Sequence, residues 1–216
     1  MSKPFSWKRF NEIPIVGILR KLPASKLDKV VKLYQQSGLT TLEITMNTDG
    51  ADEMIRQISE AFPNLNIGAG TVCNESDLQK ALNAGASFVV TPILDERIIH
   101  ACNEANVPIF PGAFTPSEIY KAWSAGAQMV KLFPAGLLGP KYIKDVLAPL
   151  DQIKLIPVGG VDLQNFTDFL DAGASGLGLG SQLFLKDAIQ NNEWKTLEKH
   201  FMAFVDKYRM YIQKKT

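Results

Sequence analysis

Two short apolar segments of this sequence each contain one ionisable residue, and both residues are candidates for chemistry. Lys131 lies within MVKLFPAG (129–136), and Glu43 lies within LEIT (42–45). Burial lowers the pKa of a lysine, so a fraction of it becomes the neutral amine that can attack a ketone and form a Schiff base. Burial raises the pKa of a carboxyl group toward neutrality, where it works best as an acid and a base.

Each of these residues also has a purely structural interpretation. Lys131 could extend its long side chain to solvent, or it could pair with Glu43 only to neutralise that carboxylate. A nearby cation would oppose the effect of burial on the pKa of Glu43, and the sequence leaves open which of the two effects is larger. We expect both side chains to face the same cavity.

Residues at the ends of three other apolar runs would complete a substrate site. Arg20 ends PIVGILR, where its planar guanidinium could bind a carboxylate or simply face solvent. Gly159 and Gly160 follow one late run, and Gly180 and Ser181 follow the next. Their backbone N–H groups would suit a phosphate, although the glycines could instead serve only as tight turns.

A recurring junction predicts the elements that hold these residues. At each junction a small residue and then a glycine or asparagine end a helical pattern, and a short apolar run follows. Such runs are typical of strands that are buried on both faces. The junction positions are Gly38, Gly85, Asn106, Gly126 and Gly173.

The helical segments between the runs have recognisable start signals. Asn74 and Thr115 are expected to be the N-caps of two helices, and the helix after the seventh run is expected to begin at Asp162. The segment 194–212 has apolar residues near helical spacing, which predicts an amphipathic helix along one side of the fold. These residues are Leu197, Phe201, Phe204, Val205, Tyr208 and Ile212.

Eight strands then alternate with helices, and this alternation predicts a parallel sheet. Eight evenly spaced units within 216 residues favour a closed (β/α)8 TIM barrel, formed by residues 1–216 as one domain, over an open doubly wound sheet. Such barrels carry their chemistry at the C-terminal ends of the strands, which would bring the candidate residues to one face. The expected strands are 13–20, 41–45, 66–71, 88–91, 108–111, 128–133, 154–158 and 176–180.

The composition argues against several classes of protein. The chain is 46% hydrophobic and 21% charged, and its net charge of +1 gives no basic surface for nucleic acid or membranes. It has no recognisable signal peptide and no apolar stretch near the roughly 20 residues that span a bilayer. Cys73 and Cys102 are expected to be reduced thiols in a cytoplasm. Because metal-ligand spacings and a dinucleotide fingerprint are both missing, we expect no metal and no cofactor.

Eight motifs occur together in this chain: GILR, LEITMNT, GAGTV, VVTP, PG, KLFPA, PVGGV and GLGS. In this order they resemble the 2-keto-3-deoxy-6-phosphogluconate (KDPG) and 4-hydroxy-2-oxoglutarate aldolase family, over about residues 12–207. The resemblance implies a class I aldolase, usually a homotrimer, that acts on a phosphorylated keto-sugar acid and releases pyruvate. It implies that Lys131 is the Schiff-base lysine and Glu43 the acid and base, and that Thr71, Pro92 and Phe133 contact the pyruvate moiety.

Two positions depart from the pattern of some family members and bear on the substrate. Asn47 stands where some members carry an arginine for the pyruvate carboxylate, so Arg20 is expected to replace it. Members that cleave the gluconate substrate typically have threonine at the position of Val158, and the valine here resembles the galactonate branch.

The rival interpretations are a phosphosugar isomerase or decarboxylase, and a non-catalytic barrel that binds a phosphorylated metabolite. Neither rival needs a lysine among apolar neighbours.

Overall fold

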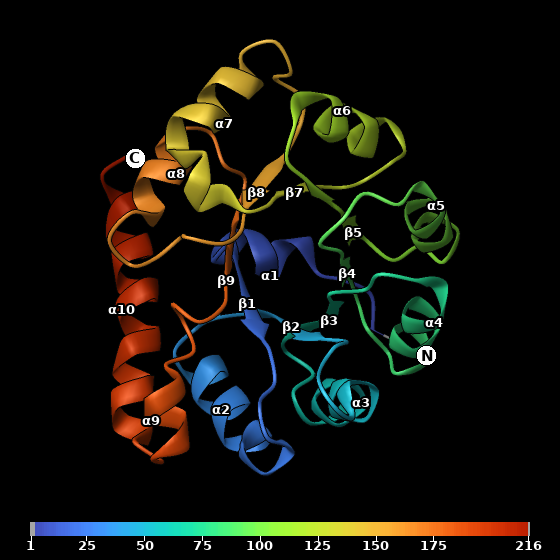
Figure 1. Ribbon diagram of the computed structural model, residues 1–216. Coiled ribbons are helices and arrows are strands. Elements are labelled where there is room, and N and C mark those ends of the chain that lie inside the picture. Colours follow the sequence, from blue (N-terminus) through green and yellow to red (C-terminus); the bar gives the residue numbers. More distant parts are fainter. Residues whose placement is uncertain (1–2, 216) are drawn as a thin grey trace.

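Helices and strands alternate along the chain, of which the computed structural model describes residues 3–215 (Figure 1). The strands are β1 (Ile15–Leu19), β2 (Thr41–Thr45), β3 (Asn66–Gly70), β4 (Val89–Val90), β5 (Ile109–Phe110), β6 (Gly112–Ala113), β7 (Val130–Leu132), β8 (Leu155–Pro157) and β9 (Leu177–Leu179). The helices are α1 (Trp7–Glu12), α2 (Ala24–Gln36), α3 (Ala51–Ala61), α4 (Glu75–Asn83), α5 (Glu96–Glu104), α6 (Pro116–Ser124), α7 (Gly139–Leu147), α8 (Phe166–Asp171), α9 (Lys186–Gln190) and α10 (Trp194–Gln213), and a 3-10 helix, η1 (Ala135–Leu137), follows β7. Within residues 3–215, no helix is long and apolar enough to cross a membrane.

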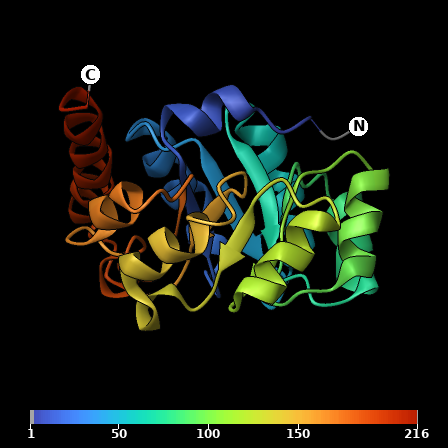
Figure 2. The ribbon, with the colours of Figure 1, turned by 90° about the horizontal axis from the view of Figure 1, so that it is seen from above.

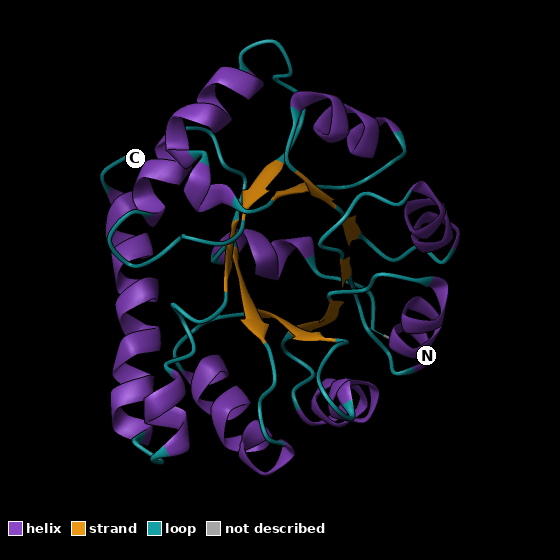
Figure 3. Ribbon diagram, viewed as in Figure 1, coloured by secondary structure: helices purple, strands orange, loops and turns teal. Residues whose placement is uncertain are grey.

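The strands pair in parallel and form two sheets. Their orders are β5-β4-β3-β2-β1-β9 and β6-β7-β8. Pro111, which has no N–H group to donate, separates β5 from β6, and an isolated bridge between Val158 and Gly178 links the end of β8 to β9. The strands ring the centre of the molecule, with most helices outside them (Figure 3). The predicted parallel α/β fold is confirmed, but the expected strand 108–111 is shortened to β5, and a further strand that was not expected, β6, follows Pro111.

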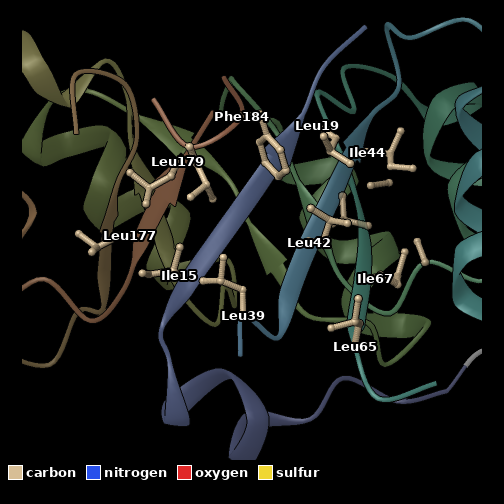
Figure 4. Close-up of a cluster of buried hydrophobic side chains, with 14 of the residues drawn as sticks. Ile15, Leu19, Leu39, Leu42, Ile44, Leu65, Ile67, Leu177, Leu179 and Phe184 are labelled. Atoms are coloured by element: carbon tan, nitrogen blue, oxygen red, sulfur yellow. The ribbon is translucent and has the colours of Figure 1, made fainter. Parts of the chain in front are cut away.

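Two apolar clusters lie on opposite faces of the strands. The outer cluster fills the space between strands and helices and includes Ile15, Leu19, Leu42, Ile44, Ile67, Leu177 and Leu179 (Figure 4). The interior cluster joins residues from both sheets and from the N-terminal segment, namely Phe5, Phe10, Val16, Phe88, Val90, Phe110, Met129 and Ile156. Successive side chains of a strand point to opposite faces, so a residue between two outer-cluster residues points inward.

The interior cluster fills the N-terminal end of the ring of strands. Its rings pack closely, with centroids 5.4 Å apart for Phe5 and Phe88 and 5.6 Å apart for Phe88 and Phe110. Helix α1 lies over this end of the strands (Figure 2). Ser6, the N-cap of α1, is held there by Asn66 at the start of β3. The N–H of Ser6 donates to Oδ1 of Asn66 (2.9 Å), and the carbonyl of Ser6 accepts a hydrogen bond from Nδ2 of Asn66 (3.0 Å). The opposite, C-terminal end is left for polar residues.

The predicted junctions are confirmed at all five positions. Each adopts a left-handed backbone directly past a helix, as expected for glycine or asparagine there. The φ angles are 96° at Gly38, 90° at Gly85, 55° at Asn106, 99° at Gly126 and 101° at Gly173. These turns return the chain to the N-terminal end of the next strand.

Two of the three predicted helix starts are confirmed. Asn74 caps α4, and Thr115 caps α6 with a complete capping box. The helix expected to begin at Asp162 begins at Phe166 instead. The carboxylate of Asp162 accepts the N–H groups of Gln164 (2.7 Å) and Asn165 (2.9 Å), which holds residues 162–165 as a turn before the helix.

The predicted C-terminal helix is α10, and it packs on other helices rather than directly on a strand (Figure 1). Phe201 packs edge-on against Tyr34 of α2, and Phe204 stacks on Phe166 of α8. The other predicted face residues are buried except Ile212, which is 41% exposed near the end of the helix.

Candidate active site

Glu43 and Lys131 are buried charged residues that point into the ring of strands from different sheets. Glu43 lies between Leu42 and Ile44 of the outer cluster on β2, and its side chain therefore points inward. Lys131 of β7 lies between Val130 and Leu132 of the outer cluster, and its side chain points inward as well. Only 1% of Glu43 and 3% of Lys131 are exposed.

The carboxyl group of Glu43 occupies space that a glycine provides. In the parallel ladder Glu43 is paired with Ile18 of β1 on one side and Gly68 of β3 on the other. A Cβ atom added to Gly70 would lie 2.0 Å from Oε1 of Glu43, so any larger residue at position 70 would displace the carboxyl group. The other oxygen, Oε2, is buried without a hydrogen-bond partner, which leaves it available to a bound molecule.

Burial decides the pKa of Glu43. Loss of solvation raises the pKa to about 7, although the positive charges of Lys131 and Arg20 act in the opposite direction. A carboxyl group with this pKa is present in both protonation states near neutral pH, so it can both accept and donate a proton.

Burial also lowers the pKa of Lys131. The negative charge of Glu43 opposes this effect, and the positive charge of Arg20 adds to it. The Nζ atom lies 4.9 Å from the centre of the Phe133 ring. Lowering the pKa increases the fraction of neutral amine, which is the nucleophilic form of a lysine.

A cavity of about 600 Å³ opens beside this pair. Arg20, exposed directly after β1, lines it, as do Phe133 and Val158 and the two glycine segments with Gly159, Gly160, Gly180 and Ser181. Arg20 interacts electrostatically with both Glu43 and Lys131, and Phe133 contacts the lysine, so the cavity adjoins the buried pair. The structure thus brings seven of the eleven predicted site residues together around one space.

The other four predicted residues do not line this cavity. Glu43 and Lys131 lie on the strands next to it, as described above. Thr71 directly follows β3 in a left-handed conformation, with φ of 56°, and Pro92 lies just beyond β4. Thr71 and Pro92 therefore lie at the C-terminal ends of their strands, the same end as Arg20.

The glycine segments present free backbone donors to the cavity. Gly159 and Gly160 have φ angles of 85° and 78°, and the carbonyl of Gly159 accepts the N–H of Gly136 (2.7 Å). In the part of the chain that the structure describes, the N–H groups of Gly160, Val161 and Ser181 have no acceptor. Unpaired N–H groups on residues that line one cavity suit an anion.

The site contains no metal-binding constellation. Across residues 3–215, no group of three or more His, Cys, Asp or Glu side chains could hold a metal ion. The sequence contained no indication of a role for Cys73. Its thiol is exposed and free, and it lies close enough to Lys131 for their charges to interact.

A buried lysine of lowered pKa, a carboxyl group with pKa near neutrality and an anion-binding corner are together suited to Schiff-base chemistry on a phosphorylated ketone. The model of the KDPG and KHG aldolase family matches residues 7–200. The chain belongs to this family. It is therefore an aldolase, an enzyme of the lyase class, and the resemblance in the motifs is confirmed.

Named relatives and one solved structure support this assignment over most of their lengths. The aldolase is 32% identical to the 2-dehydro-3-deoxy-phosphogluconate aldolase of Haemophilus influenzae, over 92% of this chain and 94% of the relative. It is 33% identical to the 2-dehydro-3-deoxy-6-phosphogalactonate aldolase of Escherichia coli K12, over 94% and 98%. A KDPG aldolase from Legionella pneumophila, captured with pyruvate as a covalent carbinolamine intermediate, superposes with a TM-score of 0.84 at 25% identity, covering 91% and 96%.

Sequence reasoning missed three residues that shape the site of this aldolase. Gly70 makes room for Glu43, Gly136 anchors Gly159, and Asn165 holds the carbonyl of Gly160. The sequence did contain a signal for Gly70. Gly68 and Gly70 are two residues apart, so they lie on the same face of β3, the strand that pairs with the LEIT segment of β2. The roles of Gly136 and Asn165 depend on loop geometry and had no signal in the sequence.

Proposed function

We propose that this aldolase cleaves a six-carbon 2-keto-3-deoxy-6-phospho sugar acid, the gluconate or its galactonate epimer, to pyruvate and glyceraldehyde 3-phosphate. The observation that carries the proposal is the buried pair of Lys131 and Glu43 beside a cavity with free backbone donors. 4-Hydroxy-2-oxoglutarate, the second substrate in the family's name, is a further candidate.

Lys131 is the proposed nucleophile. Its neutral amine attacks the C2 ketone to give a carbinolamine, which loses water to form an iminium ion. The iminium withdraws electrons, so the bond between C3 and C4 breaks and its electron pair forms an enamine. The carbinolamine captured in the Legionella relative supports this route.

Glu43 is the proposed proton carrier. As a carboxylate, directly or through water, it accepts the proton of the C4 hydroxyl, and glyceraldehyde 3-phosphate leaves. The resulting carboxylic acid then returns a proton to C3 of the enamine, and hydrolysis of the iminium releases pyruvate. The pKa of about 7 supports both steps, since neither protonation state is strongly disfavoured.

The remaining predicted residues are proposed to hold the two ends of the substrate. Arg20 and Thr71 bind the carboxylate end, and Pro92 and Phe133 pack against the pyruvate carbons. The donors of Gly159, Gly160, Gly180 and Ser181 bind the phosphate, and Val158 faces the middle of the substrate. Holding both ends aligns the bond that breaks, which lowers the entropy cost of reaching the transition state.

We also propose that the two sheets form one closed (β/α)8 barrel and that residues 1–216 are one domain. Two features support closure. The bridge between Val158 and Gly178 joins the sheets on one side, and on the other side only Pro111 separates β5 of one sheet from β6 of the other. The enzyme is proposed to be cytoplasmic and to form a homotrimer. Ile93, Phe114 and Leu137, which follow β4, β6 and β7, expose 48%, 37% and 81% of their surface, and a partner subunit would cover them.

Pyruvate release from matched substrates tests the proposal. We expect both phosphorylated epimers to be cleaved, and kcat/KM for the unphosphorylated analogue to be far lower. Gly180→Val should reduce this discrimination by blocking the corner. It is a clean variant, because the nearest atom to an added Cβ is Ile18 Cβ at 3.9 Å, whereas Gly160→Val would collide with Gly136. Equal rates on phosphorylated and unphosphorylated substrates would show that the glycines only form turns.

A further inference from the structure

A closed hydrogen-bond network joins the glycine corner to the turn before α8. Asn165 donates from Nδ2 to the carbonyl of Gly160 (2.8 Å), and its Oδ1 accepts the N–H of Asp162 (2.9 Å). The carboxylate of Asp162 accepts the N–H of Asn165 in return (2.9 Å). Nζ of Lys207 on α10 donates to the carbonyls of Leu163 (2.6 Å) and Gln164 (3.1 Å), so α10 also holds this turn.

Two backbone carbonyls of the corner, one of them bound by this network, determine where its N–H groups point. In a trans peptide unit, the C=O and N–H groups point in opposite directions. The carbonyl of Gly159 is bound by the N–H of Gly136, so the N–H of Gly160 points away from Gly136. The carbonyl of Gly160 is bound by Asn165, so the N–H of Val161 points away from Asn165.

The two freed N–H groups are consecutive, and both of their residues line the cavity. Asn165 itself does not line it. We infer that Asn165 is a positioning residue, which orients the Gly160–Val161 peptide so that its N–H binds the phosphate of the substrate. This inference rests on the proposed phosphate corner. It adds a residue that acts on the substrate only through the backbone.

The test compares two Asn165 variants with a matched control. Asn165→Ala removes the donor to Gly160. Asn165→Asp has the same size and keeps the acceptor for Asp162 N–H, but it replaces the donor with a negative charge next to Gly160. Gln164→Ala is the control, because its exposed amide side chain lies in the same turn and outside the network. Each variant is assayed on the phosphorylated substrate and on its unphosphorylated analogue, and pyruvate trapping by borohydride is measured alongside.

We expect Asn165→Ala to lower kcat/KM for the phosphorylated substrate about tenfold, mainly through KM, as for the loss of one hydrogen bond. Asn165→Asp should lose at least as much, because its charge repels the phosphate. Activity on the unphosphorylated analogue and pyruvate trapping should stay within about twofold, since both are independent of the corner. Gln164→Ala should behave as wild type.

Three results would overturn the inference. If the wild type discriminates between the substrates and both Asn165 variants keep that ratio, Asn165 does not position the corner, while the proposed function stands. Equal losses on both substrates would show a purely structural role. If the wild type itself does not discriminate, the phosphate corner fails, and the role of Asn165 fails with it.

Discussion

Replacement of Glu43 by glutamine separates the two halves of the proposed chemistry. Glutamine has nearly the same shape and fits the space beside Gly70, but it cannot carry a proton. The variant should still form the iminium with pyruvate, because Lys131 supplies the amine. It should lose the exchange of pyruvate methyl protons with solvent by about a hundredfold or more, as expected for the loss of a general acid–base group.

The pKa of Glu43 sets the expected pH dependence. Only the carboxylate removes a methyl proton, so the wild-type exchange rate should rise with pH through a midpoint near the pKa of about 7. Two pH units below this midpoint, about 1% of the carboxyl groups are ionised, and exchange should fall in proportion.

The same pKa affects the free energy of unfolding. The rise from the usual 4.5 to about 7 means that the folded site favours the neutral carboxyl group by about 3 kcal/mol. Between these two pKa values the unfolded chain binds fewer protons than the native protein, so stability falls as pH rises through this window. The glutamine variant has no proton to release, and its stability should not show this loss.

The assay is the decay of the pyruvate methyl signal by NMR in deuterated water, over a range of pH, with borohydride trapping in parallel. Glu60→Gln on the surface of α3 is the control and should exchange as wild type. Exchange at the wild-type rate in Glu43→Gln would refute the assignment of the base. A wild-type midpoint near 4.5 would refute the argument that burial outweighs the neighbouring cations.

Three further substitutions test other parts of the account. Gly70→Ala places a Cβ atom 2.0 Å from Glu43 Oε1, so cleavage should fall about a hundredfold, and wild-type activity would contradict the packing argument. Val158→Thr adds a hydroxyl group that can bind the C4 hydroxyl, so the ratio of kcat/KM should shift about tenfold toward the gluconate epimer; an unchanged ratio would assign epimer choice to other residues. Leu137→Asp charges the exposed apolar surface, so light scattering should detect dissociation of the proposed trimer, whereas a monomeric wild type would refute that proposal.

Much of the fold could be predicted because local signals and tertiary structure agree. The five junctions require a left-handed residue, and glycine or asparagine stands at each of them. The failures have local causes that only geometry reveals. A helix was expected to begin at Asp162, but the carboxylate of Asp162 accepts hydrogen bonds within a turn, and α8 begins only at Phe166. Pro111 has no N–H group, so β5 ends before it, and the short strand β6 that follows it was not expected.

The candidate site was predictable where a charge interrupts an apolar run. Lys131 and Glu43 were found in this way, and their burial is confirmed. The balance between desolvation and the neighbouring charges was not predictable, because it depends on how far Lys131 and Arg20 lie from the carboxyl group in space. The network of Asn165 was also beyond the sequence, since an asparagine before a helix is usually only a cap.

The most direct test of the central claim is the mass of the protein after incubation with pyruvate and borohydride. The wild type should gain one reduced pyruvate adduct, and peptide mapping should place it on Lys131. Lys131→Ala should gain none, whereas Lys186→Ala, which removes a lysine from the lining of the same cavity, should be trapped as the wild type is. An adduct that persists in Lys131→Ala, or that maps to another lysine, would contradict the account.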